Sequence, residues 1–145
     1  MITVAVSGYF DPLTRNHLNH FDIAKLMGDY LIVILSKDED VARKRLNTDL
    51  KNAQVWNVEE RIDILRHLKP VNEVVVSVDT DGSVAETLKL IRPDIFAKGY
   101  SRYPSNMPEQ EIKACQEIGC RIVYNVGGHV NETHSSDILR RLLNR

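Results

Sequence analysis

ITVAVSGYFDPLTRNH, residues 2–17, is the stretch of this sequence that decides the fold. Its first six residues are mostly apolar or β-branched, as expected for a strand that is buried on both faces. A glycine and a polar turn follow, and from residue 17 onward apolar residues recur at helical spacing at positions 18, 21, 24 and 27. We expect a strand, a short turn and a helix in that order, which is the unit from which parallel α/β sheets are built.

The same alternation continues along the chain. The predicted strands are Ile2–Ser7, Tyr30–Ser36, Glu73–Val78, Asp94–Lys98 and Arg121–Val126. The predicted helices are His17–Met27, Asn57–Leu68, Ser83–Ile91, Pro108–Ile118 and Ser135–Leu143. This order predicts a single Rossmann-like α/β domain over residues 1–145, in which helices doubly wind a five-stranded parallel sheet.

Composition narrows the classes of function. The chain has 145 residues and a formal net charge of −1, which argues against nucleic acid or a membrane surface as a partner recognised through bulk positive charge. The sequence starts without a basic leader, and no apolar run approaches the roughly 20 residues that span a bilayer, so we expect a cytoplasmic protein. Cys115 and Cys120 are spaced neither as a disulfide framework nor as metal ligands, and we expect both to pack in the interior.

In a doubly wound sheet, ligands bind beyond the carboxyl ends of the strands. The segments expected there are 8–17, 37–45, 79–83, 99–103 and 127–136. Gly8 directly follows the first strand and would let the backbone approach a phosphate without a Cβ in the way. Thr14, Asn16 and His17 fall at a helix start, where free N–H groups and the helix dipole attract anions. The alternative is that Thr14 and Asn16 only cap the helix and that His17 is solvated.

These residues resemble a known signature. Gly8-Tyr9-Phe10-Asp11 followed by Thr14-x-x-His17 is similar to the motif G-x-F-D-x-x-[H/T]-x-G-H of the cytidylyltransferase-like nucleotidyltransferases. That superfamily includes heptose-phosphate adenylyltransferases, glycerol-3-phosphate cytidylyltransferases, phosphopantetheine adenylyltransferases and archaeal FMN adenylyltransferases. Asn16 departs from the pattern, because the family has glycine at that position.

The resemblance continues along most of the chain. Residues 26–33 resemble the family's second strand, and Lys44 falls where glycerol-3-phosphate cytidylyltransferases keep a phosphate-contacting lysine. Glu59-Glu60-Arg61 resembles the helix whose arginine reaches the active site, and residues 93–99 resemble the P-D-x-x-x-K-G turn of heptose-phosphate adenylyltransferases. Residues 134–138 resemble the helix start that holds the β- and γ-phosphates, with His134 in place of a serine.

Each of these positions also has a simpler interpretation. Lys44 lies in a basic run, which is usually a solvated face. Arg61 would pair with an acidic residue one turn away on its helix. Ser135 and Ser136 would serve as N-caps without any ligand.

The resemblance implies a nucleotidyltransferase, in which a substrate phosphate attacks the α-phosphorus of a nucleotide and pyrophosphate leaves. The catalytic residues that it implies are His17, Thr14, Lys44 and Arg61. The nucleotide-binding residues that it implies are Gly8, Tyr9, Phe10, Thr14, Asn16, His17, Lys98, Gly99, Ser135 and Ser136. Such a site positions polyanions and neutralises growing charge, so it needs no catalytic carboxylate pair. We expect Mg²⁺ to be held by the substrate phosphates and no metal site on the protein.

We expect transfer of AMP from ATP to a phosphate-bearing small molecule such as a sugar phosphate, with a cytidylyltransferase as the alternative. The Lys98-Gly99 turn favours ATP with a sugar phosphate as acceptor, whereas the spacing from Gly8 to Lys44 fits a cytidylyltransferase that uses CTP and a polyol phosphate such as glycerol 3-phosphate. Because Asn16 and His134 depart from the family at phosphate-contacting positions, a non-catalytic nucleotide-binding module is a further alternative. Small members of the superfamily often form dimers, so a homodimer is a candidate assembly. His20, His67 and His129 receive no role.

Overall fold

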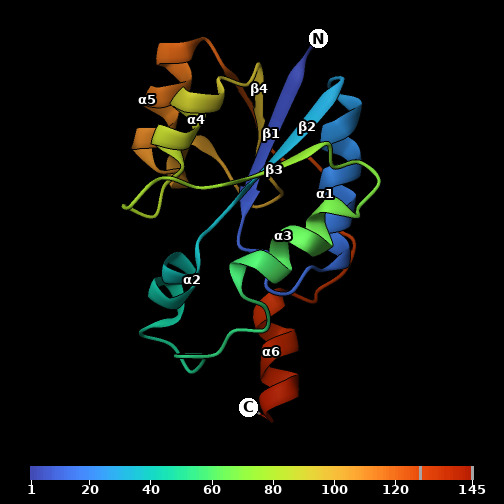
Figure 1. Cartoon of the computed structure of the whole chain (residues 1–145), viewed down its shortest axis with the longest axis vertical. Helices are drawn as coiled ribbons and strands as arrows, with labels where there is room; N and C mark the ends of the chain where they lie inside the picture. The colour runs from blue at the N-terminus through green and yellow to red at the C-terminus, as the bar shows by residue number, and fades with distance from the viewer. Residues whose placement is uncertain (128, 145) are drawn as a thin grey trace.

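The computed structural model describes residues 1–127 and 129–144. Its strands form one parallel sheet in the order β3-β2-β1-β4-β5 (Figure 1). The strands are β1 (Thr3–Gly8), β2 (Tyr30–Leu35), β3 (Glu73–Val76), β4 (Ile95–Ala97) and β5 (Arg121–Val123). The predicted five-stranded parallel sheet is confirmed, and each strand lies within its predicted run or one residue beyond it.

Helices cover both faces of the sheet. The helices of the described chain are α1 (Arg15–Leu26), α2 (Asp38–Arg45), α3 (Val58–Arg66), α4 (Ala85–Ile91), α5 (Glu109–Ile118) and α6 (Ser135–Leu143), with a 3-10 turn at Pro104–Asn106. Helices α1 and α3 lie on one face and α4 and α5 on the other (Figure 1). Val4 and Val6 of β1 belong to the core beneath α1 and α3, whereas Ala5 belongs to the core beneath α4 and α5. Cys115 and Cys120 are buried in that second core, as expected, and the doubly wound arrangement is confirmed.

Helix α2 forms where the sequence analysis expected only a connecting loop. Its sequence, DEDVARKR, offers Val41 as the one large apolar side chain, so it has no apolar stripe to indicate a helix. The order of its charges does indicate one, because acidic residues fill the first turn and basic residues the last. Both arrangements are favourable to the helix dipole. The missed helix matters for function, since it is the element that carries Lys44.

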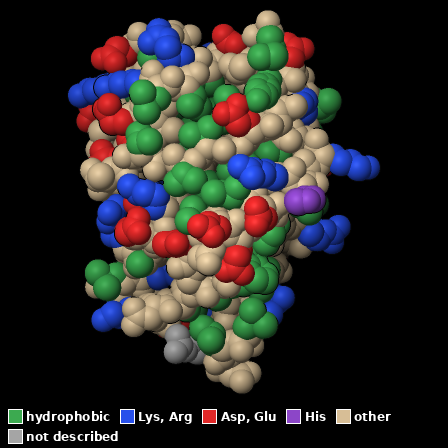
Figure 2. All heavy atoms as spheres, in the orientation of Figure 1, with side chains coloured by type: hydrophobic (Ala, Val, Ile, Leu, Met, Phe, Trp, Pro, Cys, Tyr) green, Lys and Arg blue, Asp and Glu red, His purple; other side chains and the backbone are tan. Residues whose placement is uncertain are grey.

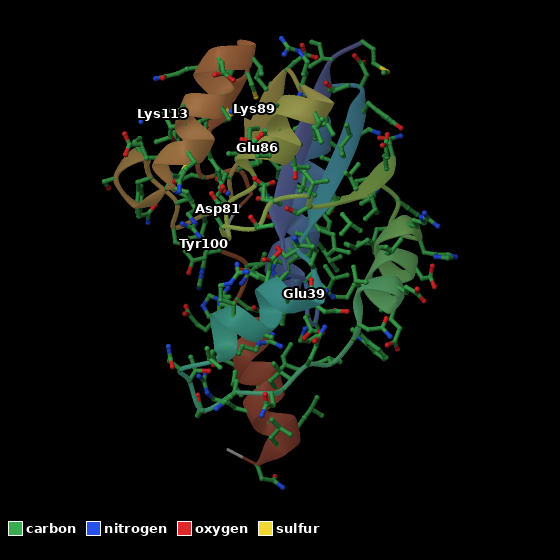
Figure 3. The ribbon with its side chains drawn as sticks, turned by 60° about the vertical axis from the view of Figure 1, so that its left-hand side comes forward. Glu39, Asp81, Glu86, Lys89, Tyr100 and Lys113 are labelled. Atoms are coloured by element: carbon green, nitrogen blue, oxygen red, sulfur yellow. The ribbon has the colours of Figure 1, made fainter. Side chains whose placement is uncertain are left out.

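The strand order reverses between β1 and β4, which makes the carboxyl ends of these two strands the topological switch point. Figure 3 shows that Asp81, which follows β3, and Tyr100, which follows β4, lie toward α2, the helix that carries Glu39. Acidic and basic side chains are interspersed over the face seen in Figure 2. In the described part of the chain, no helix is long and apolar enough to cross a membrane.

Candidate active site

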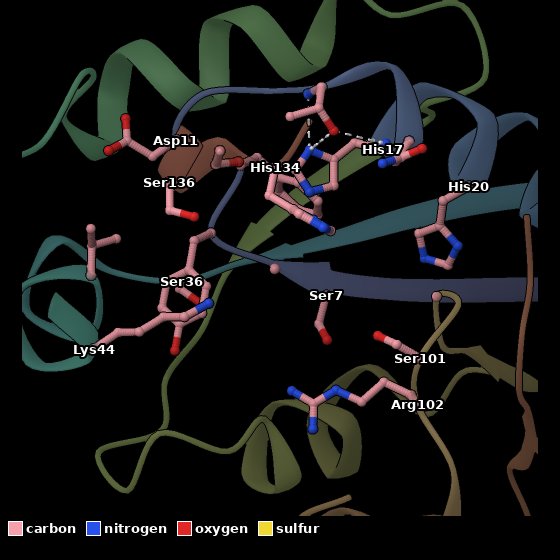
Figure 4. Close-up of a pocket in the computed structure, with 18 of the residues that line it drawn as sticks. Ser7, Asp11, His17, His20, Ser36, Lys44, Ser101, Arg102, His134 and Ser136 are labelled. Atoms are coloured by element: carbon pink, nitrogen blue, oxygen red, sulfur yellow. Dashed lines mark hydrogen bonds between the residues drawn. The ribbon is translucent and has the colours of Figure 1, made fainter. Parts of the chain in front are cut away.

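A cavity of about 510 Å³ opens at the switch point. Its walls come from segments far apart in the sequence, namely the turn after β1, the start of α1, α2, the loops after β3, β4 and β5, and the start of α6 (Figure 4). The predicted residues that line it are Gly8, Tyr9, Phe10, Thr14, Asn16, His17, Lys44, Lys98, Gly99, Ser135 and Ser136. Arg61 is the predicted residue that the structure does not bring to this cavity.

His17 lies in the first turn of α1 and directs its ring into the cavity (Figure 4). Its Nδ1 accepts a hydrogen bond from the backbone N–H of Thr14 at 3.0 Å, while the Thr14 hydroxyl accepts from the His17 backbone N–H at 3.4 Å. Burial, reinforced by His20 and Lys44, lowers the pKa of His17 to about 4. A backbone N–H can only donate, so the neutral ring carries its proton on Nε2. This proton is a hydrogen-bond donor for the cavity.

Phe10 supports the His17 ring. The backbone of Phe10 is left-handed, with φ of 51°, and its ring lies against the end of β1. The ring contacts His17 edge to face, with centroids 5.0 Å apart, and contacts Phe21 at 5.1 Å. A Cβ added at Gly8 would lie 2.7 Å from the Phe10 Cζ atom. The missing Cβ of Gly8 therefore also makes room for the Phe10 ring, while the approach of a phosphate to this glycine stays a prediction.

Cationic side chains border the cavity on two sides. Lys44 comes from α2, and its Nζ lies 4.3 Å from the centroid of the Tyr9 ring. Arg102 comes from the loop after β4 (Figure 4). Burial lowers the pKa of Lys44, and the nearby Arg45 and Arg102 lower it further. An anionic ligand would favour the charged form of Lys44, because it would offset both the burial and the repulsion.

Lys98 and Glu111 form a buried ion pair in the lining of the cavity. The Lys98 Nζ lies 3.4 Å from the Ser7 hydroxyl and 3.7 Å from Glu111 Oε1. Burial lowers the pKa of Lys98, and the Glu111 carboxylate partly offsets this effect. Glu111 Oε2 accepts a hydrogen bond from the Val84 backbone at 3.1 Å, whereas Oε1 is buried and has no hydrogen-bond partner among the described residues. Oε1 is therefore compensated by its ion pair with Lys98 and not by a hydrogen bond.

The start of α6 closes one end of the cavity. The Ser135 hydroxyl donates to the Pro12 carbonyl at 2.7 Å, and Ser136 also lines the cavity (Figure 4). His134 is the N-cap, and its backbone N–H donates to the Asp137 carboxylate at 2.9 Å. The Asp137 N–H donates to the His134 carbonyl at 3.0 Å, whereas the first two N–H groups of a helix have no intrahelical acceptor, so this end of α6 is suited to bind an anion.

Asn16 attaches the segment before α6 to α1. Its Oδ1 accepts hydrogen bonds from the backbone N–H groups of Val130 and Asn131, at 2.8 and 3.2 Å. Its Nδ2 donates to the Asn131 carbonyl at 3.0 Å. The side chain that replaces the family's glycine is thus engaged with the chain itself.

Arg61 lies on α3, and its side chain is 0% exposed. Its guanidinium donates to the carbonyls of Tyr9, Ser36 and Trp56 and to the Asp38 carboxylate, at 2.8 to 3.2 Å. It lines a smaller apolar cavity on the other side of the turn after β1. Arg61 therefore fixes the turns that follow β1 and β2, and it is a positioning residue in this structure.

Asp11 and Arg45 form a second buried brace. The Asp11 carboxylate is fully buried and accepts hydrogen bonds from the backbone of Val55 and Trp56 and from the Arg45 guanidinium, the last at 2.7 Å. Arg45 also donates to the carbonyls of Asp11 and Ala53. The acidic residue of the signature thus holds together the turn after β1, α2 and the segment that precedes α3.

The family model described as cytidylyltransferase-like matches residues 5–141. The chain belongs to the cytidylyltransferase-like family. It is a nucleotidyltransferase, as the sequence resemblance implied.

Curated relatives of this cytidylyltransferase-like chain carry the name FAD synthase. The protein from Picrophilus torridus is 31% identical over 97% of this chain and 95% of its own length. The protein from Pyrococcus abyssi is 35% identical over 68% of this chain and 62% of its own length. Among solved structures, a lipopolysaccharide core biosynthesis protein from Thermoplasma volcanium aligns with a TM-score of 0.67 at 25% identity, over 88% of this chain and 98% of the other.

The cytidylyltransferase-like site also contains residues that the sequence analysis did not assign. These are His20, Tyr100, Arg102, Glu111, His134 and Arg140. Glu111 could have been found from the helical spacing of α5, because it falls on the buried face with Ala114 and Cys115. An acidic residue at a core position of a helix is unusual without a partner or a ligand. For Arg102 the sequence offers no such signal, since its position depends on the course of the loop after β4.

Proposed function

We propose that this protein transfers AMP from ATP to the phosphate of a small acceptor and releases pyrophosphate, and that FMN is the first acceptor to test. The observation that supports the transfer is the His17 Nε2 proton in a cavity bordered by Lys44, Lys98 and the start of α6. The curated relatives named FAD synthase support FMN, because joining FMN to AMP gives FAD.

In the proposed reaction, a phosphate oxygen of the acceptor attacks the α-phosphorus of ATP. A new P–O bond forms, the bond to the β-phosphate breaks, and pyrophosphate leaves with the bonding electron pair. The attacking group is already an anion, so the site needs no protein nucleophile or strong base. Its task is to align two polyanions and to stabilise charge in the transition state.

The described side chains divide this task by position. The His17 Nε2–H would donate to an α-phosphate oxygen, with Thr14 fixing the ring through its backbone N–H. Lys44 and Arg102 would hold the acceptor phosphate. Ser136 and the N-terminus of α6 would hold the leaving pyrophosphate. Arg61, which the sequence analysis placed on the incoming phosphate, acts instead through the turns that it braces.

Mg²⁺ would enter with the nucleotide. Among the described residues, no three His, Cys, Asp or Glu side chains lie close enough together to hold a metal ion. Hydroxyl, imidazole and cationic groups dominate the cavity, which suits an ion carried by phosphate oxygens and water. Such an ion neutralises phosphate charge in the reaction.

A sugar phosphate is the second candidate acceptor. The Lys98-Gly99 turn, which resembles that of heptose-phosphate adenylyltransferases, lines the cavity, and the similar Thermoplasma volcanium structure is that of a lipopolysaccharide core biosynthesis protein. CTP with glycerol 3-phosphate is tested in the same experiment.

The test is pyrophosphate release from purified protein with Mg²⁺, each of ATP, CTP, GTP and UTP, and a panel of acceptors. The panel contains FMN, sugar 1-phosphates, glycerol 3-phosphate and phosphopantetheine. We expect release with ATP and FMN, and FAD identified as the product by its mass. Release of pyrophosphate with a sugar phosphate but not with FMN would identify the sugar phosphate as the acceptor. Nucleotide binding without release across the panel would favour a binding module and contradict the proposal.

A further inference from the structure

His20 is a cavity residue without a role in the proposed reaction. It lies three positions after His17 on α1, and both rings border the cavity (Figure 4). The His20 Nδ1 lies 2.7 Å from the Val126 carbonyl oxygen. A carbonyl can only accept, so Nδ1 must carry a proton. Burial lowers the pKa of His20 and outweighs the opposing effect of the bond to the Val126 carbonyl, so the neutral ring is favoured.

The two histidines therefore present opposite chemistry. His17 accepts through Nδ1 and offers an N–H from Nε2, whereas His20 donates through Nδ1 and offers the lone pair of Nε2. No described residue makes a hydrogen bond to the His20 Nε2 atom. Phosphate oxygens that are deprotonated are acceptors only, so they cannot satisfy this lone pair. The ligand group that binds to His20 must be a hydrogen-bond donor.

Glu111 does not share this requirement. Its Oε1 is buried and forms an ion pair with the Nζ of Lys98 at 3.7 Å. The His20 Nε2 lone pair is therefore the acceptor for which a ligand in the cavity must supply a donor.

The positions of the other groups show which part of a nucleotide would lie here. In Figure 4, Lys44 and Ser136 lie to one side of His17, and His20 lies to the other. With the α-phosphate on His17, the acceptor phosphate on Lys44 and pyrophosphate on α6, the nucleoside extends toward His20. This step rests on the proposed function. Nucleosides carry the donors required, as the exocyclic amine of adenine or cytosine and as ribose hydroxyls.

We propose that His20 binds the nucleoside half of the nucleotide, its Nε2 lone pair accepting a hydrogen bond from a donor on the base or the ribose. The pair of tautomers on α1 then favours one orientation of the nucleotide, because deprotonated phosphate oxygens can accept from His17 but cannot donate to His20.

The test compares ATP with analogues that each lack one donor: purine riboside triphosphate, 2′-deoxy-ATP and 3′-deoxy-ATP. Dissociation constants are measured by calorimetry for the wild type, His20→Phe and His20→Asn. Phenylalanine keeps much of the ring volume, whereas asparagine can still donate to Val126 but lacks the acceptor at the position of Nε2. His67→Phe is the matched control, because His67 makes the same kind of bond, to the Asp63 carbonyl at 2.7 Å, on the exposed end of α3.

We expect one analogue to bind the wild type about tenfold more weakly than ATP does, as for the loss of one buried hydrogen bond. In both His20 variants this ratio should fall to within about twofold, and in His67→Phe it should be unchanged. The analogue that discriminates identifies the amine or the hydroxyl as the donor. An unchanged ratio in the His20 variants, or no discrimination by the wild type, would overturn the proposal. Because binding is measured without turnover, this pattern would stand even if no acceptor released pyrophosphate, whereas failure to bind any nucleotide would refute both proposals.

Discussion

The α1 wall of the cavity and the buried arginines Arg45 and Arg61, here called the brace, use their polar side chains in opposite ways. On α1, His17 and His20 each use one ring nitrogen on the backbone and keep the other for the cavity. In the brace, Arg61 and Arg45 direct their guanidinium groups to carbonyls and carboxylates of the chain itself. Charge near a site therefore does not identify a ligand-binding residue. The hydrogen bonds that a side chain has left to make are the better guide.

The largest expected effect tests the brace. Arg61→Met removes the donor from three carbonyls and a carboxylate, so we expect the free energy of unfolding to fall by about 4 kcal/mol. Urea unfolding measures it. Arg66→Met, at an exposed position on the same helix, is the matched control and should change it by less than about 0.5 kcal/mol. Arg61→Met with wild-type stability but no activity would show that Arg61 acts on the substrate, which would erase the contrast between the two regions.

The next effect tests the α1 wall. His17→Ala removes the proposed donor to the α-phosphate, and we expect kcat to fall by about 10²-fold, as for the loss of an oxyanion donor. The lost bond to the Thr14 backbone should lower the free energy of unfolding by only about 1 kcal/mol. Steady-state kinetics and urea unfolding separate the two effects. Turnover like that of the wild type would end the assignment of His17.

The pH dependence of stability sharpens the same comparison. Because the pKa of His17 is lowered to about 4 in the folded protein, the unfolded chain takes up a proton at His17 below its ordinary pKa of 6.5 while the folded protein does not. Stability should therefore decline as pH falls from about 6.5 toward 4. Melting temperatures in this range should show a weaker decline for His17→Ala. An equal decline in both proteins would mean that His17 is protonated in the folded state.

The smallest effect concerns Asn16. Asn16→Gly restores the family's residue but removes three hydrogen bonds to residues 130 and 131, so we expect a loss of about 1 kcal/mol in the free energy of unfolding. The nucleotide KM should rise, because the segment before α6 loses its attachment. Asn16→Asp keeps the acceptor for the two N–H groups and should give an intermediate KM. A lower KM for Asn16→Gly would show instead that the asparagine obstructs the ligand.

The comparison also shows which features of the fold and of the site can be predicted from the sequence. Apolar periodicity predicts the parallel sheet, which the structure confirms. The resemblances at residues 8–17 and 134–138 predict that Thr14, His17 and Ser135 bind a nucleotide. All three line one cavity, and their roles stay predictions. The apolar pattern does not predict α2, because this helix is favoured by the order of its charges and has no apolar stripe. Nor does it tell whether Arg61 extends toward a ligand or toward nearby carbonyls, because both need the same residue on the same face of a helix.

Two hydrogen bonds described above join the early and late parts of the chain: Asn16 binds Asn131, and Ser135 binds Pro12, across 115 and 123 positions. During synthesis on the ribosome, His17 and His20 leave the exit tunnel long before the residues that complete their cavity. A nascent chain that ends before Asn131 has α1 but neither the segment that Asn16 binds nor the start of α6. The complete cavity therefore exists only after α6 has left the tunnel, and a nucleotide that needs all of its walls can stabilise the fold only from that point.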